Sequence, residues 1–266
     1  MDTVTRSYFD LEKINENYKL VIDDFERINT VIHCKRDVFD AAMARNLLYA
    51  YNHINNHLAS NPGRAMLSWK DILELNLIVH LGTSAESRRQ YYRFIKHTEE
   101  RFEAGFPSLM QWYERHEHSE DDPYKIAAGL YVRILAQPQL FVEGNHRTGA
   151  LVANYFLLLK SQEPFVMTPG NAVEFLNLAS DVKFKSNDIR SKFKRAIGWR
   201  DELARMRAFL KENARPFTTG VIPKWPFGDY ELREAEDVLK SIRRRRSRHK
   251  GEDAAQGSDA SKTVAS

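Results

Sequence analysis

The stretch QLFVEGNHRTGALVANYFLLLK, from Gln139 to Lys160, changes in character near its middle. It opens as a polar turn with a glycine, and from about His146 it becomes an apolar segment with helical spacing. The first N–H groups of a helix have no partner inside it and lie at the positive end of the helix dipole, so anions bind there. The stretch therefore predicts a buried helix and a place where an anionic ligand would bind.

The residues at this junction suit a phosphate-bearing ligand. Gly144 lets the backbone turn sharply and approach a ligand closely, and Arg147 can donate two hydrogen bonds to phosphate oxygens. The Asn145 side chain can cap the helix or join Arg147, and His146 can donate to phosphate or face solvent. Glu143 fits such a site when a Mg²⁺ ion is shared between its carboxylate and the phosphate oxygens. The alternative is a buried loop in which the asparagine caps the helix and the arginine pairs with Glu143.

Helical spacing recurs on both sides of this stretch, whereas strand-like alternation is scarce. Ser68 with Asp71, and Asp122 followed by Pro123, are typical of helix starts. The segment RRQYYRFIKHTEERFEAGFP, Arg88–Pro107, fits a helix or a small hairpin, and we favour the hairpin. Helices are predicted at roughly 10–29, 37–58, 69–81, 107–117, 123–137, 146–161, 170–180, 187–213 and 229–246.

These elements predict an all-α protein with a possible small β-hairpin and a disordered C-terminal tail. We expect N-terminal helices over 1–67, the main helical domain over 68–215, and a linker with a basic helix over 216–250. The tail 251–266 consists mainly of Gly, Ser, Asp and Ala, with few large apolar residues, so it cannot bury enough surface to order itself. The sequence makes no prediction of the oligomeric state.

The composition limits where the protein works and what it binds. The single cysteine, Cys34, rules out internal disulfides and multi-cysteine metal sites among the 266 residues. No apolar run approaches the ~20 residues of a membrane span, and the first residues do not resemble a signal peptide. We therefore expect a cytoplasmic protein of bacterial type without a transmembrane segment, with delivery into a host cell as an alternative.

The positive charge is concentrated near the C-terminus. The net charge is +4, the segment 241–250 (SIRRRRSRHK) contributes +6 and the segment 251–266 contributes −2, so the first 240 residues sum to 4 − 6 + 2 = 0. The basic run 243–250 predicts weak contact with nucleic acid or an acidic surface, or else a solvated helix end.

Phe141, Glu143, Gly144, Asn145 and Arg147 together resemble the signature of the Fic/Doc (Fido) family, H-P-F-x-D/E-G-N-G/K-R-x-x-R. The preceding segment DPYKIAAGLYVRILA resembles the helix that leads into that motif, and the similarity extends over roughly 69–181. The resemblance implies a mostly helical fold with a loop between two central helices and a hairpin flap. It also implies that ATP or a related nucleotide binds with Mg²⁺ at Glu143. In such proteins AMP or another phosphate-containing group is transferred to a Ser, Thr or Tyr hydroxyl of a protein partner.

The departures from this pattern concern the chemistry. Gln139 stands where the family has the histidine that acts as the base, and glutamine cannot take a proton from a hydroxyl. His146 stands where Gly or Lys is usual and is a candidate substitute base. Ala150 lacks the arginine that the pattern would place on phosphate. The first hypothesis is a nucleotide-binding protein that is a weak or altered transferase or a pseudoenzyme. The alternative is a non-catalytic interaction module of antitoxin or effector type, with a vestigial phosphate site.

His53 and His57 are four residues apart, on one face of a predicted helix. This spacing suits a metal site, or two surface residues near a helix C-terminus, where imidazolium is favoured.

Overall fold

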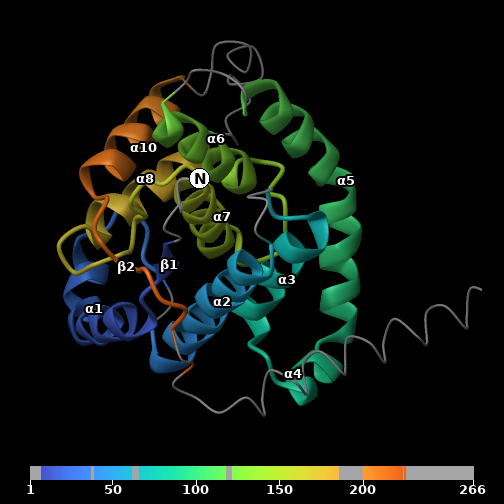
Figure 1. The fold of residues 1–266 in the computed structure, drawn as a ribbon, viewed down its shortest axis with the longest axis horizontal. Helices are drawn as coiled ribbons and strands as arrows, with labels where there is room; N and C mark the ends of the chain where they lie inside the picture. Colours follow the sequence, from blue (N-terminus) through green and yellow to red (C-terminus); the bar gives the residue numbers. More distant parts are fainter. Residues whose placement is uncertain are drawn as a thin grey trace, which may run out of the picture.

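The computed structural model describes residues 7–36, 39–61, 66–117, 122–185, 200–223 and 225. Within them the chain is helical apart from one very small sheet, which confirms the all-α prediction (Figure 1). The predicted helix 229–246, the basic run 243–250 and the tail 251–266 lie outside the described residues. The helices are α1 (Leu11–Val31), α2 (Ala41–Ser60), α3 (Trp69–Leu81), α4 (Ala85–Gln90), α5 (Tyr92–His116), α6 (Pro123–Leu135), α7 (Asn145–Leu159), α8 (Ala172–Lys185) and α10 (Arg200–Glu212).

Helix starts were the best-predicted local features. Ser68 and Asp71 form a capping box in which each side chain bonds the other residue's backbone N–H, and α3 ends at Gly82, as predicted. Pro123 opens α6, and the Asp122 side chain accepts from the N–H of Tyr124. The short helix α4 was not predicted.

The hairpin favoured for 88–107 is wrong, because most of this segment belongs to the long helix α5. Ile95, Thr98 and Phe102 recur every three or four residues and are buried. A helix places all three side chains against the core, whereas a hairpin would expose about half of them. Pro107 lies inside α5 and removes one N–H that would have bonded Glu103. Glu103 and Pro107 are both exposed, so water can reach the carbonyl that loses its partner.

The only sheet in the described part of the chain joins its two ends. Strand β1 (Tyr8–Phe9) pairs antiparallel with β2 (Thr218–Thr219), so the segment expected to be a linker closes onto the N-terminal region. The buried Asn55 of α2 holds β1 from the other side, because its amide accepts from the Phe9 N–H and donates to the Phe9 carbonyl, at 2.8 and 2.9 Å.

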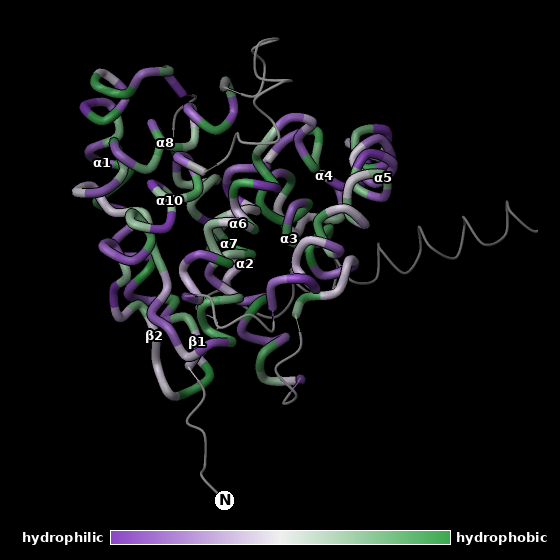
Figure 2. Tube along the Cα trace, turned by 90° about the horizontal axis from the view of Figure 1, so that it is seen from above, coloured by the Kyte–Doolittle hydropathy of each residue, from purple (hydrophilic) through white to green (hydrophobic). Residues whose placement is uncertain are grey.

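Helix α7 occupies the centre of the molecule, in contact with α2, α3 and α6 (Figure 1). Figure 2 shows hydrophobic residues at this centre, whereas α1 and α5 at the periphery alternate between hydrophobic and hydrophilic residues. One hydrophobic core runs from Phe9 to Phe217 and includes residues of every long helix. No helix in the described residues is long and apolar enough to cross a membrane. The start of α7, where the ligand is expected, is therefore fixed by packing on several sides.

Candidate functional site

Gly144 forms the turn that starts α7. Its backbone is left-handed, with φ of 75°, and a Cβ atom there would lie 2.8 Å from Nδ2 of Asn76. The fully buried Asn76 of α3 donates from Nδ2 to the Glu143 carbonyl at 2.8 Å and to Oγ1 of Thr148 at 3.0 Å. The loop therefore lies directly against α3, and only glycine fits at this turn.

The Asn145 side chain holds the loop and does not cap α7. Its Oδ1 accepts from the Phe141 N–H at 2.8 Å and its Nδ2 donates to the Phe141 carbonyl at 2.9 Å, with the residue only 4% exposed. In this arrangement both polar atoms of the amide bond the backbone of its own loop. Because no side chain caps α7, its first-turn N–H groups remain available to an anion.

Replacing Asn145 with Ala is expected to lower the free energy of unfolding by about 2–4 kcal/mol, because each unsatisfied buried backbone group costs about 1–3 kcal/mol. Urea denaturation would measure this loss. Asn55→Ala removes the equivalent pair of bonds to Phe9, away from the site, and should cost a similar amount. An unchanged stability of Asn145→Ala would contradict the bracing role.

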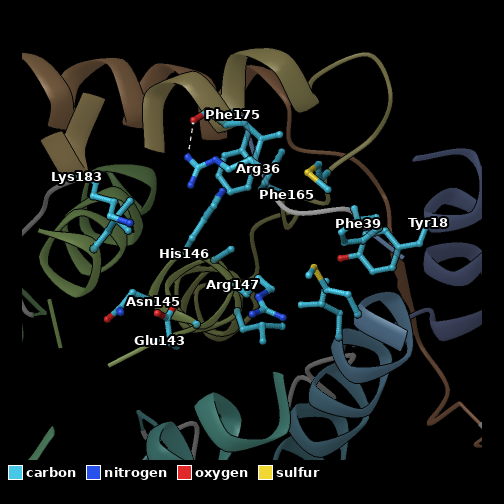
Figure 3. Close-up of a pocket in the computed structure, with 18 of the residues that line it drawn as sticks. Tyr18, Arg36, Phe39, Glu143, Asn145, His146, Arg147, Phe165, Phe175 and Lys183 are labelled. Atoms are coloured by element: carbon cyan, nitrogen blue, oxygen red, sulfur yellow. Dashed lines mark hydrogen bonds between the residues drawn. The ribbon is translucent and has the colours of Figure 1, made fainter. Parts of the chain in front are cut away.

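A cavity of about 220 Å³ extends from the start of α7 into the interior (Figure 3). Its volume lies just below the range of roughly 300–1,000 Å³ that is typical of ligand pockets. Gln139, Glu143, Gly144, Asn145, His146 and Arg147 all line it, so one cavity brings together the residues selected from the sequence. Its charged residues are Arg36, Glu143, Arg147 and Lys183, and the rest of the lining is mainly apolar: Tyr18, Phe25, Phe39, Met43, Leu47, Tyr51, Leu135, Ala150, Leu151, Phe165, Met167, Phe175 and Leu176.

His146 is a neutral side chain in this cavity. Its Nδ1 lies 2.8 Å from the hydroxyl of Tyr131, and its ring packs against Phe175 with centroids 4.5 Å apart. Burial, and then the charge of Arg36, lower the pKa of His146 to about 3. A group with so low a pKa is a weak general base near neutral pH.

Arg147 spans from α7 to the C-terminal part of α3. Its Nη1 donates to the Val79 carbonyl at 2.6 Å. Burial lowers the pKa of Arg147, while the carboxylates of Glu143 and Asp40 act in the opposite direction. An arginine keeps its charge under such a shift, so the cavity has a fixed cation beside the first turn of α7.

Gln139 and Glu143 lie in the loop that precedes α7. The Gln139 carbonyl accepts from Nε of Arg101 in α5 at 2.8 Å, which fixes the backbone of this cavity-lining residue. Glu143 is exposed and is the one carboxylate among the described residues of the lining. Among the described residues, no cluster of three His, Cys, Asp or Glu side chains could hold a metal ion. Since Mg²⁺ is often bound by one or two carboxylates plus substrate phosphates, Glu143 fits an ion that enters with a phosphate ligand.

Comparison with solved structures finds likenesses, of which one is described here. The chain resembles the crystal structure of a Fic domain-containing signaling protein from Bacteroides thetaiotaomicron. The two have 13% sequence identity and a TM-score of 0.47, over 88% of this chain and 90% of that one. No protein-family model and no curated protein matches the chain. The likeness is one of chain path alone.

Arg36, Lys183 and Tyr131 were missed in the sequence. Arg36 lies in the connector after α1 and Lys183 near the end of α8, far from the motif along the chain. No local pattern marks them, because their role depends on how that connector packs against α8. Tyr131 lies in α6, and its helical spacing marks it only as a core residue.

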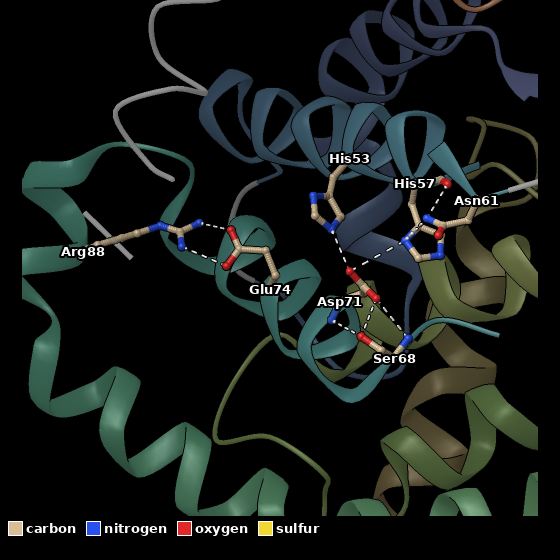
Figure 4. A network of polar contacts seen from close by, with 7 residues as sticks. All are labelled: His53, His57, Asn61, Ser68, Asp71, Glu74 and Arg88. Atoms are coloured by element: carbon tan, nitrogen blue, oxygen red, sulfur yellow. Dashed lines mark hydrogen bonds and ion pairs between the residues drawn. The ribbon is translucent and has the colours of Figure 1, made fainter. Parts of the chain in front are cut away.

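His53 and His57 lie outside this cavity and share a neighbour from α3 (Figure 4). Oδ1 of Asp71 is 4.0 Å from Nε2 of His53 and 3.7 Å from Nδ1 of His57. Burial lowers the pKa of His53, and Asp71 is already bonded in the capping box with Ser68. The pair thus packs α2 against the start of α3, and it does not form part of a three-residue metal cluster among the described residues.

Proposed function

We propose that the protein binds a nucleotide or a related phosphate ester in the cavity at the start of α7, with little or no transfer of the phosphate group. The observation that carries this proposal is the composition of the cavity. Three cations, Arg36, Arg147 and Lys183, face one carboxylate, Glu143, and the remaining lining is mainly apolar. Such a cavity suits an anion that carries an apolar or aromatic group.

The phosphate end of the ligand would lie at the helix start. The first-turn N–H groups of α7 and the Arg147 guanidinium are preorganised donors there. Glu143 would hold a Mg²⁺ ion together with the phosphates, and that ion would neutralise part of their charge. The organic part of the ligand would extend between α1, α2 and α8, against Tyr18, Phe39 and Met43.

The same residues offer no effective base for transfer to a protein hydroxyl. Gln139 can orient a hydroxyl by hydrogen bonding but cannot take its proton. His146 would have to act with a pKa of about 3 and with one ring nitrogen already bonded to Tyr131. Positioning and charge stabilisation can leave some residual transfer, since phosphoryl chemistry depends heavily on both.

Mg·ATP is expected to bind the wild-type protein, and Arg147→Gln is expected to weaken binding roughly 10–100-fold, because a hydrogen bond to a charged group contributes about 1.5–3 kcal/mol. Isothermal titration calorimetry on the full chain measures both affinities. Arg89→Gln removes an exposed arginine of α4 outside the cavity and is the matched control. If the wild type does not bind, the cavity is not a nucleotide site and a non-catalytic interaction module becomes the better hypothesis.

A further inference from the structure

Arg36 is held rigidly although it lies in a connector. The Asn29 side chain of α1 clamps its backbone, accepting from the Arg36 N–H at 2.8 Å and donating to the Arg36 carbonyl at 3.1 Å. Nη2 of the guanidinium donates to Oγ of Ser180 at 2.7 Å and to the Leu176 carbonyl at 3.2 Å, both in α8. The head group is thus fixed on the α8 wall of the cavity, as Figure 3 shows.

The charge of Arg36 has no counter-charge among the residues that the structure describes. None of the described carboxylates forms an ion pair with it, and its Nε is buried without a hydrogen-bond partner. A buried donor without a partner is costly, and more so when it carries charge. A guanidinium that is fixed in place but incompletely bonded is a typical preorganised anion receptor.

His146 completes this wall. Tyr131 is 1% exposed, and its hydroxyl lies within hydrogen-bond distance of His146 Nδ1, so the simplest arrangement has Tyr131 donating to Nδ1. The ring proton then lies on Nε2, which makes the neutral imidazole a donor. Burial is the main cause of both the lowered pKa of His146 and the raised pKa of Tyr131, and the charge of Arg36 acts on both groups, which is consistent with a guanidinium close to both rings.

We propose that Arg36 is a second anion-binding residue, separate from Arg147, and that the ligand therefore carries at least two anionic groups, as a nucleoside diphosphate does. One group binds the α7 start and Arg147, and the other binds Arg36 with His146 beside it. Figure 3 shows Arg36 at α8 and Arg147 on α7, on different walls. The inference rests on the proposed function, since it takes the cavity to be the ligand site.

The test compares ADP with AMP, each with Mg²⁺, by calorimetry on the full chain. Arg36→Gln is expected to weaken ADP binding by at least about tenfold and AMP binding by less than about threefold. The reason is that the substitution removes the charged guanidinium donors from only one of the two anionic groups, the one that AMP lacks. Arg147→Gln should weaken both, and Arg89→Gln neither. Every variant keeps the basic run 243–250, so binding to that run is common to all.

Two results would overturn the proposal. Either Arg36→Gln binds ADP as tightly as the wild type does, or the substitution weakens ADP binding and AMP binding by the same factor. Either result would leave the proposed function intact. If the wild type binds neither AMP nor ADP, the proposed function and the inference about Arg36 both fail. Arg36→Lys keeps the charge without the Nε donor and should lie between Gln and wild type. It serves as the test variant if circular dichroism shows that Arg36→Gln has lost helix.

Discussion

Replacing Gln139 with His is expected to raise transfer of label from α-labelled ATP to protein by about 10²–10⁴-fold, the usual contribution of a general base. Gln139 lines the same cavity as Glu143 and Arg147, so a histidine there would stand next to the bound phosphates. The neighbouring Arg101 holds only the backbone of Gln139, and the substitution therefore leaves that bond in place. The measurement is the rate of labelling in a lysate, with wild type and variant side by side.

The control for this experiment is Gln139→Asn, which changes the side chain without adding a titrating group. Gln139→His combined with Arg147→Gln should lose the gained activity, because the ligand would no longer be held. Labelling by Gln139→His no faster than by the wild type, while Mg·ATP still binds, would mean that position 139 does not face the acceptor hydroxyl.

Replacing Glu74 with Gln is expected to lower the free energy of unfolding by about 3–5 kcal/mol, the usual cost of breaking a buried ion pair. Arg88 is fully buried, and its two terminal nitrogens donate to the Glu74 carboxylate at 3.0 and 2.7 Å (Figure 4). Nη2 also bonds the Gly82 carbonyl, so the pair ties α3 to α4. The Glu74 side chain is 19% exposed, which places the loss near the lower end of the range. Urea denaturation measures it.

The exposed pair Lys96 and Glu100, 3.8 Å apart on α5, provides the comparison. Glu100→Gln should change stability by less than about 1 kcal/mol, since solvent screens such pairs. The double variant Glu74→Leu with Arg88→Met should recover most of the loss, because two apolar side chains leave no charge buried alone. Equal effects of Glu74→Gln and Glu100→Gln would show that the buried pair contributes no more than a surface pair.

The helices could be predicted because apolar residues recur every three or four positions and because helix starts carry capping residues. That is why α3, α6 and α7 were placed closely. The same spacing exists at Ile95, Thr98 and Phe102, but the polar residues between them also fit a turn. Only the contact of Ile95, Thr98 and Phe102 with the core decides between the helix and the hairpin. Local pattern therefore predicts an element well when one conformation clearly buries more apolar surface than the other.

The candidate site could be predicted only in part. The residues of the motif lie together because they are neighbours on one loop and one helix turn. Whether Asn145 bonds a ligand or its own loop depends on how near the Phe141 backbone lies, and the sequence left both open. Arg36 enters the cavity because Asn29 and α8 hold it there. Contacts of this kind arise between segments distant in sequence, where no periodic pattern reports them.

The asparagine clamps have a further consequence for association between chains. At Phe9, Phe141 and Phe165, as at Arg36, one buried or half-buried asparagine amide supplies the two backbone hydrogen bonds that a neighbouring strand would otherwise supply. An unpaired strand edge is a template on which another chain can add. Because a side chain has already filled these backbone positions, each extended segment is held in place without offering such an edge. Asparagine therefore lets this helical protein hold non-helical segments in place without a neighbouring strand, and two of them, at Phe165 and Arg36, line the cavity.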